Sequence, residues 1–204
     1  MSVLNTIKLL EDLYKDGIES GGVNLNRHNW DILSDIYGGD IVFRSYLDPR
    51  KGFAWRITET LDGETVFDLV RDKMTLNRYT NVDKYGLLGL SAIDKADRSV
   101  ILTEGVSDYF TAKILCPDRN VLGVTTLTGS RTAKTILVNL FDTYIICTDN
   151  DTGKERNTGY TNSSRFREFL ESYGKNVNIF LPADGYKDIS DNFIGKLRQN
   201  EKEK

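Results

Sequence analysis

Two different patterns of hydrophobic and polar residues divide the chain near residue 95. From residue 99 onward, short and continuously apolar runs alternate with amphipathic stretches. The apolar runs predict strands at 99–103, 120–125, 143–148 and 177–182. The stretches between and after them predict helices at 106–115, 131–141, 162–173 and 192–200. Buried strands separated by helices are typical of a parallel sheet covered on both faces, so we predict a Rossmann-like α/β unit over residues 96–204.

The first part of the chain has a weaker pattern, which predicts a small α+β subdomain over residues 1–95. Apolar residues at helical spacing indicate helices at 3–16 and 30–37, and a strand follows at 41–47. Residues 53–67 have the pattern of a hairpin around Asp62-Gly63, a favoured two-residue turn.

Acidic residues follow three of the predicted strands. Glu104 comes directly after the first strand, Asp149 and Asp151 after the third, and Asp188 lies one short loop beyond the fourth. Because the carboxyl ends of parallel strands line one crevice, we expect these side chains to converge. Crowded carboxylates repel one another unless a proton or a cation neutralises them, and Mg²⁺ prefers oxygen ligands. The pattern therefore predicts a metal site.

A simpler interpretation of the segment 149–151 stays open at this point. Asp149, Asn150 and Asp151 are also residue types that satisfy amides in turns and at helix starts. An EF-hand loop is excluded, because Gly153 falls one place early and the twelfth position is Tyr160.

Composition limits the chemistry further. There are 27 basic and 30 acidic residues, a formal charge of −3, so contacts with nucleic acid must be local. One histidine and two cysteines exclude histidine triads and predict no zinc site. No apolar run approaches the length of a membrane span, and the first residues lack a basic region before an apolar stretch, so we expect no membrane partner and a cytoplasmic location.

Several segments resemble a known family. The segment ILTEGVSDYFTA resembles the first TOPRIM motif, and IICTDND resembles its aspartate-x-aspartate motif. TTLTGSRTAKTI and FLPADGYKDISD are similar to the corresponding stretches of bacterial and phage DnaG-type primases. The resemblance covers roughly residues 84–192.

The resemblance implies roles for the acidic residues. Glu104 would act in acid/base or metal chemistry, and divalent metal, Mg²⁺ or Mn²⁺ in its place, would be held by Glu104, Asp149, Asp151 and Asp188. Asp108 and Asp191 are second-tier candidates. The implied activity is synthesis of short RNA primers on single-stranded DNA from nucleoside triphosphates, by a protein of a phage or other mobile element. A replicative helicase or a separate zinc-bearing protein would be a partner.

The chain departs from the family in two places. The glycine that usually follows the second aspartate is either early, as Gly153, or late, as Gly159, which implies an inserted loop. The usual zinc-binding module has no counterpart in these residues. Two alternatives therefore stay open, a TOPRIM nuclease that attacks a phosphodiester with water, and a non-catalytic module that binds nucleic acid or replication proteins.

Basic residues offer candidate contacts to nucleotides or nucleic acid. Lys154 and Arg156 could assist as cationic clamps, or they are solvated loop charges. Between residues 44 and 85, basic residues that include Arg56, Arg78 and Lys84 are interleaved with aromatic ones. This mixture suits a template strand, although a small core with charges facing water gives the same pattern.

Overall fold

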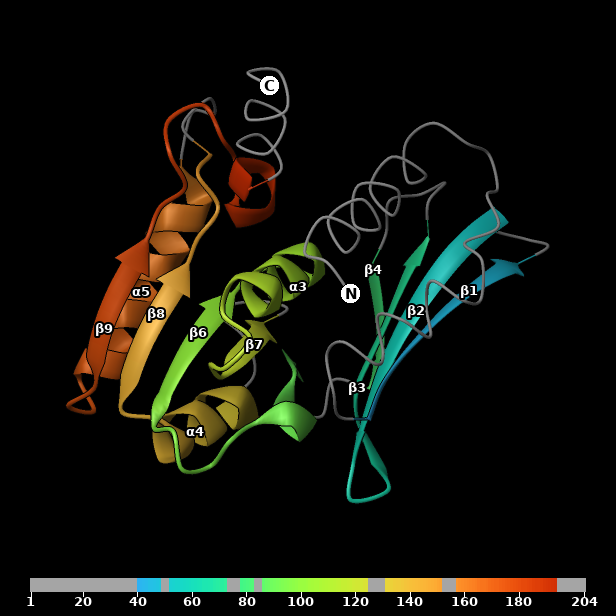
Figure 1. Ribbon diagram of the computed structural model, residues 1–204, viewed down its shortest axis with the longest axis horizontal. Coiled ribbons are helices and arrows are strands. Elements are labelled where there is room, and N and C mark those ends of the chain that lie inside the picture. Colours follow the sequence, from blue (N-terminus) through green and yellow to red (C-terminus); the bar gives the residue numbers. More distant parts are fainter. Residues whose placement is uncertain are drawn as a thin grey trace. The chain divides into compact units, whose positions relative to one another are not determined.

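The computed structural model describes residues 40–48, 52–72, 78–82, 86–124, 131–151 and 157–193 (Figure 1). The chain forms two compact units, Met1–Tyr85 with Gly89–Ala92, and Gly86–Leu88 with Ile93–Lys204. The helices predicted at 3–16 and 30–37, and residues 194–200 of the last predicted helix, lie outside the described residues. The predicted domain boundary between residues 95 and 96 stays a prediction.

The first unit contains a four-stranded antiparallel sheet in the order β1-β2-β3-β4. Its strands are β1 (Asp40–Asp48), β2 (Gly52–Leu61), β3 (Glu64–Asp72) and β4 (Arg78–Val82). Asp62 and Gly63, between β2 and β3, have φ values of 52° and 79°. Positive φ at both central residues is what a tight hairpin turn of this twist requires, which confirms the turn predicted here.

A buried carboxylate connects this sheet to the 3-10 helix η1 (Leu90–Ala92). Glu59 on β2 is fully buried, and its two oxygens accept hydrogen bonds from the amides of Gly89 at 2.7 Å and Ser91 at 2.6 Å. Because both oxygens are paired, the cost of removing the carboxylate from water is offset.

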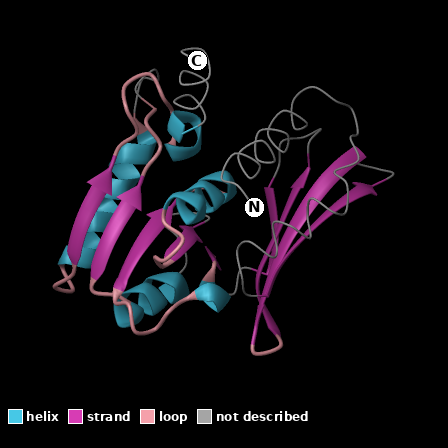
Figure 2. Cartoon of the chain, viewed as in Figure 1, coloured by secondary structure: helices cyan, strands magenta, loops and turns pink. Residues whose placement is uncertain are grey.

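The second unit contains a five-stranded sheet in the order β5-β7-β6-β8-β9 (Figure 2). Its strands are β5 (Leu87–Leu88), β6 (Ser99–Thr103), β7 (Val121–Val124), β8 (Thr143–Cys147) and β9 (Asn176–Phe180). β7, β6, β8 and β9 are mutually parallel, and the short β5 pairs antiparallel with β7. The predicted α/β fold class with its parallel sheet is confirmed, whereas the sequence did not predict β5.

Three helices connect the parallel strands. They are α3 (Val106–Leu115), α4 (Arg131–Leu140) and α5 (Thr158–Glu171). Figure 1 shows α3 and α5 on opposite faces of the sheet. The ammonium of Lys134 on α4 lies 5.0 Å from the ring centre of Phe169 on α5, so these two helices are neighbours. This arrangement follows from right-handed crossovers, because the chain moves first to one side of β6 and then to the other.

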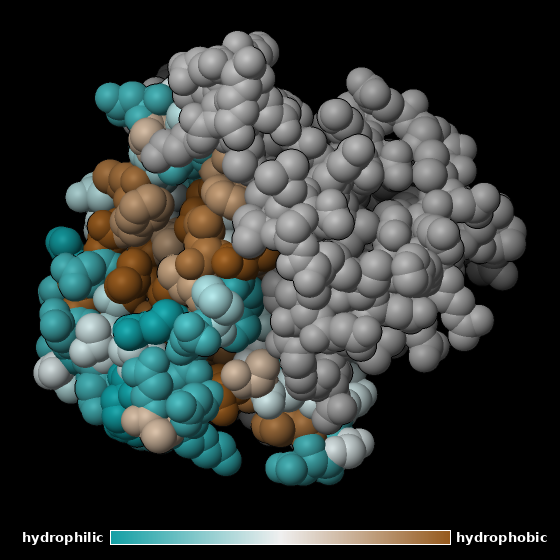
Figure 3. Space-filling view, in the orientation of Figure 1, coloured by the Kyte–Doolittle hydropathy of each residue, from teal (hydrophilic) through white to brown (hydrophobic). Residues whose placement is uncertain are grey.

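The core of this unit is formed by fully buried side chains from strands and helices. Leu102, Leu122 and Ile146 come from the strands, and Tyr109 and Leu137 come from α3 and α4. Apolar side chains are also exposed on one face, over β8 and β9 (Figure 3), where the large ones include Ile145, Phe180 and Leu181. No helix in the described ranges is long and apolar enough to cross a membrane.

Ion pairs join the amino ends of three parallel strands. The carboxylate of Asp142, just before β8, lies 2.9 Å from Arg98 before β6 and 2.8 Å from Lys175 before β9. The hydrogen bonds from Arg98 and Lys175 lower the pKa of Asp142 to about 2. This edge of the sheet is therefore fixed by opposite charges, and the carboxyl ends of the same strands carry the acidic residues described next.

Candidate metal centre

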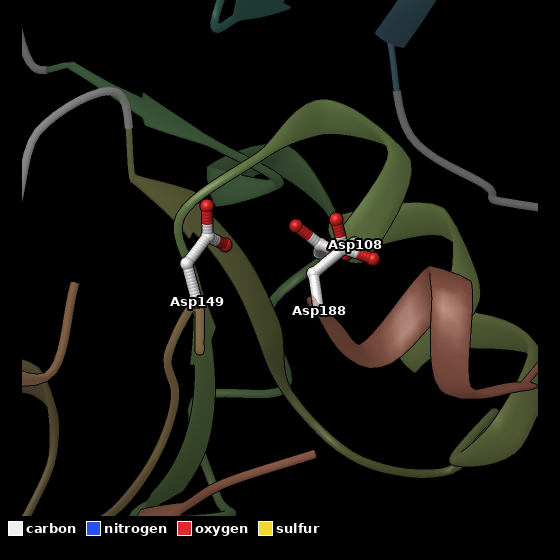
Figure 4. A group of neighbouring side chains, drawn as sticks. All are labelled: Asp108, Asp149 and Asp188. Carbon is white, nitrogen blue, oxygen red and sulfur yellow. The ribbon is translucent and has the colours of Figure 1, made fainter. Parts of the chain in front are cut away.

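Three aspartates from distant parts of the sequence meet at the carboxyl ends of the strands. Asp108 lies in the first turn of α3, Asp149 follows β8, and Asp188 lies in the loop after β9. One carboxylate oxygen of each lies within 4.8 Å of the others. Figure 4 shows the three carboxyl groups turned toward one space from three separate segments. We call these three residues the acidic trio.

Asp108 is held in place by the segment that follows β9. Its Oδ1 accepts hydrogen bonds from the hydroxyl of Ser190 at 2.7 Å and from the Ser190 amide at 3.2 Å. Burial, followed by the negative charge of Asp188, raises the pKa of Asp108 to about 6. A carboxyl group with this pKa is ionised at neutral pH only against an electrostatic cost.

Asp188 and Asp149 share a lysine. The ammonium of Lys187 lies 3.0 Å from Oδ2 of Asp149 and 3.6 Å from Oδ2 of Asp188. Asp188 is buried, its Oδ1 accepts a hydrogen bond from the amide of Asp191 at 2.7 Å, and burial raises its pKa. One lysine lies against three carboxylates, so the trio keeps an excess of negative charge, which favours a cation.

Glu104 lies beside the trio, directly after β6. One of its oxygens accepts hydrogen bonds from the hydroxyls of Thr148 at 3.4 Å and Ser163 at 3.3 Å. Burial, followed by the charge of Asp149, raises the pKa of Glu104 to about 7, although both hydroxyls oppose the shift. At neutral pH this group can therefore take up or release a proton, as a general acid or base must.

Asn157 organises the segment that contains Asp151. Its side-chain oxygen caps α5 by accepting from the amide of Tyr160 at 3.1 Å, and it accepts from the amide of Asp151 at 3.3 Å. Its side-chain nitrogen donates to Asn150 at 3.2 Å. α5 begins at Thr158, four residues before the predicted start, because this N-cap ends the loop there.

Gly159 lets the start of α5 approach Asp149 closely. A Cβ at this position would lie 2.5 Å from the carbonyl oxygen of Asp149 and 3.0 Å from its Cβ. Backbone oxygen and Cβ atoms cannot rotate out of the way as the end of a flexible side chain can, so a larger residue would displace Asp149. The late glycine noted in the sequence therefore lies close to the first aspartate of the Asp-x-Asp pair.

The donor set of the trio fits a divalent metal ion. All three groups are carboxylates, the ligands that Mg²⁺ and Mn²⁺ accept, and two of the three are buried. Oxygens bound to one Mg²⁺ lie about 3.0 Å apart when they are neighbours and about 4.2 Å apart when they are opposite, since the usual bond length is about 2.1 Å. The three oxygens of the trio lie within 4.8 Å of one another, so binding one ion through all three requires these side chains to move closer together.

The structure brings together some of the residues predicted for the site. Asp149 and Asp188 are in the trio, and the second-tier candidate Asp108 joins them. Glu104 adjoins the trio without being part of it. Asp151 and Asp191 are not members of the trio either. The roles assigned to these residues stay predictions.

Sequence reasoning did not single out Asn157, Ser163, Lys187 or Ser190, which all contact the residues of the site. In the sequence, Gly159 stands out only as a departure from the glycine spacing of the family. Asn157 carries a usable signal, because asparagine is a common N-cap. The contacts of Ser163, Lys187 and Ser190 depend on how α5 and the loop after β9 approach Glu104, Asp149 and Asp108.

Most of the basic residues predicted to contact nucleotides or the template strand lie outside the part of the chain that the structure describes. Lys84, Lys154 and Arg156 lie outside the described residues. Arg56 on β2 and Arg78 on β4 are described by their backbone alone, and the sheet register pairs them with Arg44 and Arg71. Their predicted contacts stay predictions.

Solved primases share this fold. The primase fragment of the bacteriophage T7 primase-helicase protein superposes with a TM-score of 0.61 at 16% identity, over 95% of this chain and 84% of that one. The Aquifex aeolicus primase, in a structure of its zinc-binding and RNA polymerase domains, gives 0.54 at 18% identity, over 98% of this chain and 60% of that one. The DnaG catalytic core superposes with a TM-score of 0.51 at 16% identity, over 84% of this chain and 57% of that one.

These likenesses confirm the predicted primase-core fold, which includes the TOPRIM-type unit. The chain spans less than two thirds of the Aquifex primase and DnaG chains that it matches. No protein-family profile matches the sequence, and no curated protein does.

Replacing Asp108 with asparagine should stabilise the metal-free protein and remove its response to metal. The folded-state pKa of Asp108, about 6, is above the ordinary value of 3.8, so the ionised group makes folding less favourable as pH rises from about 4 to about 6. At pH 8 without metal, Asp108→Asn should unfold with a free energy on the order of 1 to 2 kcal/mol higher than the wild type. Urea denaturation at pH 5 and pH 8, with and without Mg²⁺, measures both effects.

The asparagine oxygen can still accept the hydrogen bonds from Ser190, so the variant should fold normally. Asp118→Asn is the control, because Asp118 is exposed at the end of α3. A variant that is less stable than the wild type at pH 8 without metal, or that responds fully to Mg²⁺, would contradict the account of the trio.

Replacing Gly159 with alanine should weaken metal binding by moving Asp149. A misplaced ligand typically costs about tenfold or more in affinity, which calorimetric titration with Mn²⁺ can measure. Helix propensity alone would favour alanine here. The control is Gly174→Ala, because Gly174 has a φ of +72° and open space around it, so alanine should lower stability without changing Mn²⁺ affinity. Wild-type affinity in Gly159→Ala would refute this role.

Proposed function

We propose that this chain is a DnaG-like primase catalytic core that synthesises short RNA primers on single-stranded DNA in a metal-dependent reaction. One observation carries the proposal, the acidic trio at the carboxyl edge of a sheet whose fold is that of primase cores. Carboxylates converging there, with an excess of negative charge, suit the binding of a divalent ion and, through it, of a nucleoside triphosphate.

The residues of the trio would hold the ion through the carboxylate oxygens that accept no hydrogen bond from Ser190 or from the Asp191 amide. Asp108 and Asp188 each use Oδ1 to accept bonds from Ser190 and from the Asp191 amide, so Oδ2 of each is the natural ligand. Asp149 contributes the third carboxylate. When bound, Mg²⁺ or Mn²⁺ would supply charge neutralisation for the phosphates and would orient the reacting oxygens.

Glu104 is proposed to move the proton. The attacking group in primer synthesis is the 3′-hydroxyl of a ribonucleotide, which attacks the α-phosphorus of the incoming nucleoside triphosphate. The hydroxyl loses its proton as the new phosphodiester bond forms, the bond from the α-phosphorus to the bridging oxygen breaks, and pyrophosphate leaves. A carboxylate with a pKa of about 7, next to the trio, can accept that proton near neutral pH. Thr148 and Ser163 orient the carboxylate by their hydrogen bonds.

Basic residues would hold the template and the phosphates. We assign the DNA strand to Arg56, Arg78 and Lys84, because basic residues interleaved with aromatic ones can bind a single strand. We assign the triphosphate to Lys154 and Arg156. The proposed protein partner is a replicative helicase or a separate zinc-bearing protein, as the resemblance to DnaG-type primases implies. The setting would be the cytoplasm of a cell that carries a phage or a mobile element.

The most direct test is extension of an RNA oligonucleotide annealed to a single-stranded DNA template. Extension asks less of the enzyme than initiation, since only one nucleotide must be positioned at a time. The wild type should add ribonucleotides in Mg²⁺ or Mn²⁺, and Glu104→Gln should reduce the rate by about 100-fold or more. Denaturing gels measure both. Glu168→Gln, at an exposed position on α5, should act like the wild type.

The denaturing gel also distinguishes extension from cleavage. Shortened nucleic acid that disappears in Glu104→Gln would replace the proposal with a nuclease, in which water attacks instead of a 3′-hydroxyl. Neither extension nor cleavage, together with a shift of the DNA in a native gel by a protein that binds Mn²⁺, would identify a non-catalytic binding module.

A further inference from the structure

Lys187 places its positive charge against two members of the acidic trio. Its ammonium lies 3.0 Å from Oδ2 of Asp149 and 3.6 Å from Oδ2 of Asp188. Lys187 has no role in the proposed reaction. In the described part of the chain, its ion pairs are the ones formed with the trio.

The atoms that Lys187 contacts are those that a metal ion would need. Oδ1 of Asp188 accepts the Asp191 amide at 2.7 Å, so only Oδ2 is left to face a metal, and Lys187 lies against that atom. It also contacts Oδ2 of Asp149. An ion bound through these two oxygens would come close to the present position of the ammonium, and two cations at such a distance repel each other strongly.

We propose that Lys187 is a built-in counter-ion that takes the place of the divalent metal in the metal-free protein and swings away when the metal binds. The inference rests on the metal site of the proposed function and adds the residue that competes for it. An ammonium is a compact charge with three donors on a flexible stem, so it can bridge carboxylates and leave again. It thereby limits the repulsion that would otherwise separate the trio before metal arrives.

The main chain of Lys187 is fixed by its own hydrogen bonds, so the side chain can move without disturbing the loop. Its amide donates to Asp191 and its carbonyl accepts from the amide of Asn150, so the backbone joins the two acidic loops. The side chain is 55% exposed and has solvent to move into. Substituting the side chain therefore removes the charge and keeps the loop connections.

The first test compares the affinity of variants for Mn²⁺ and Mg²⁺ alone, by calorimetric titration without nucleotide. Lys187→Gln should bind the ions about tenfold more tightly than the wild type, because no charge has to be displaced. Its metal-free form should melt at a lower temperature, since Asp149 and Asp188 lose their counter-ion. Lys187→Arg keeps the charge and should stay near the wild type.

Lys175→Gln is the matched control. It also removes one lysine from an ion pair with an aspartate, but Lys175 precedes β9, whereas Lys187 follows it. The two ends of this five-residue strand lie roughly 16 Å apart. The metal affinity of Lys175→Gln should therefore equal that of the wild type.

The second test follows the ammonium directly. Mass spectrometry can measure how fast an amine-reactive reagent modifies each lysine, with and without Mg²⁺. Modification of Lys187 should become severalfold faster when metal is added, while Lys175 keeps its rate.

Two results would overturn the inference alone: a wild type that binds Mn²⁺ while Lys187→Gln binds it equally or more weakly, or a labelling rate of Lys187 that metal leaves unchanged. A wild type that binds no Mn²⁺ would instead refute the metal site itself, and with it the proposed function.

Discussion

The crowding of Asp108, Asp149 and Asp188 is the constraint on which the rest of the site depends. Three carboxylate oxygens within 4.8 Å of one another, two of them on buried residues, form an arrangement that repels itself when ionised. The surrounding residues offset part of that repulsion. Ser190 donates to Asp108, the Asp191 amide donates to Asp188, and Lys187 lies against Asp149. The remaining negative charge would favour a divalent cation at this site.

The two edges of the parallel sheet use charge in opposite ways. At the amino ends of the strands, Asp142 is paired with Arg98 and Lys175, which lowers its pKa to about 2. At the carboxyl ends, burial and like charges raise the pKa of Glu104 to about 7. The ion pairs at the amino ends of the strands stabilise the fold. The crowded carboxylates at the carboxyl ends make it less stable, because their charges are only partly offset, and such a cost is typical of functional sites. Both features arise from residues placed at the ends of the same short strands.

The sequence allowed prediction of the elements that local pattern determines. The four apolar runs form β6, β7, β8 and β9 close to the predicted bounds. Asp62 and Gly63 form the predicted turn between β2 and β3. Asp149 and Asp188 could be expected to meet because strand exits converge in a parallel sheet. Asp151 is predicted to hold metal with Asp149, but β8 ends at Cys147 and the Asp151 amide donates to the side chain of Asn157, so the role of Asp151 stays a prediction.

What the sequence could not predict depends on contacts between distant segments. Asp108 was only a second-tier candidate on the sequence, and its hydrogen bond with Ser190, 82 residues later, could not be predicted from the pattern. Gly159 matters only because α5 approaches Asp149 closely enough to exclude a Cβ. The position of Lys187 depends on the course of the loop after β9, for which the apolar pattern contains no information.

The central claim is that the acidic trio is a metal centre, and a crystal of the protein soaked in Mn²⁺ tests it most directly. The account predicts anomalous density between Asp108, Asp149 and Asp188, at about 2.1 to 2.3 Å from carboxylate oxygens of at least two of them. Anomalous density elsewhere, with the three carboxylates free of metal at saturating Mn²⁺, would contradict it.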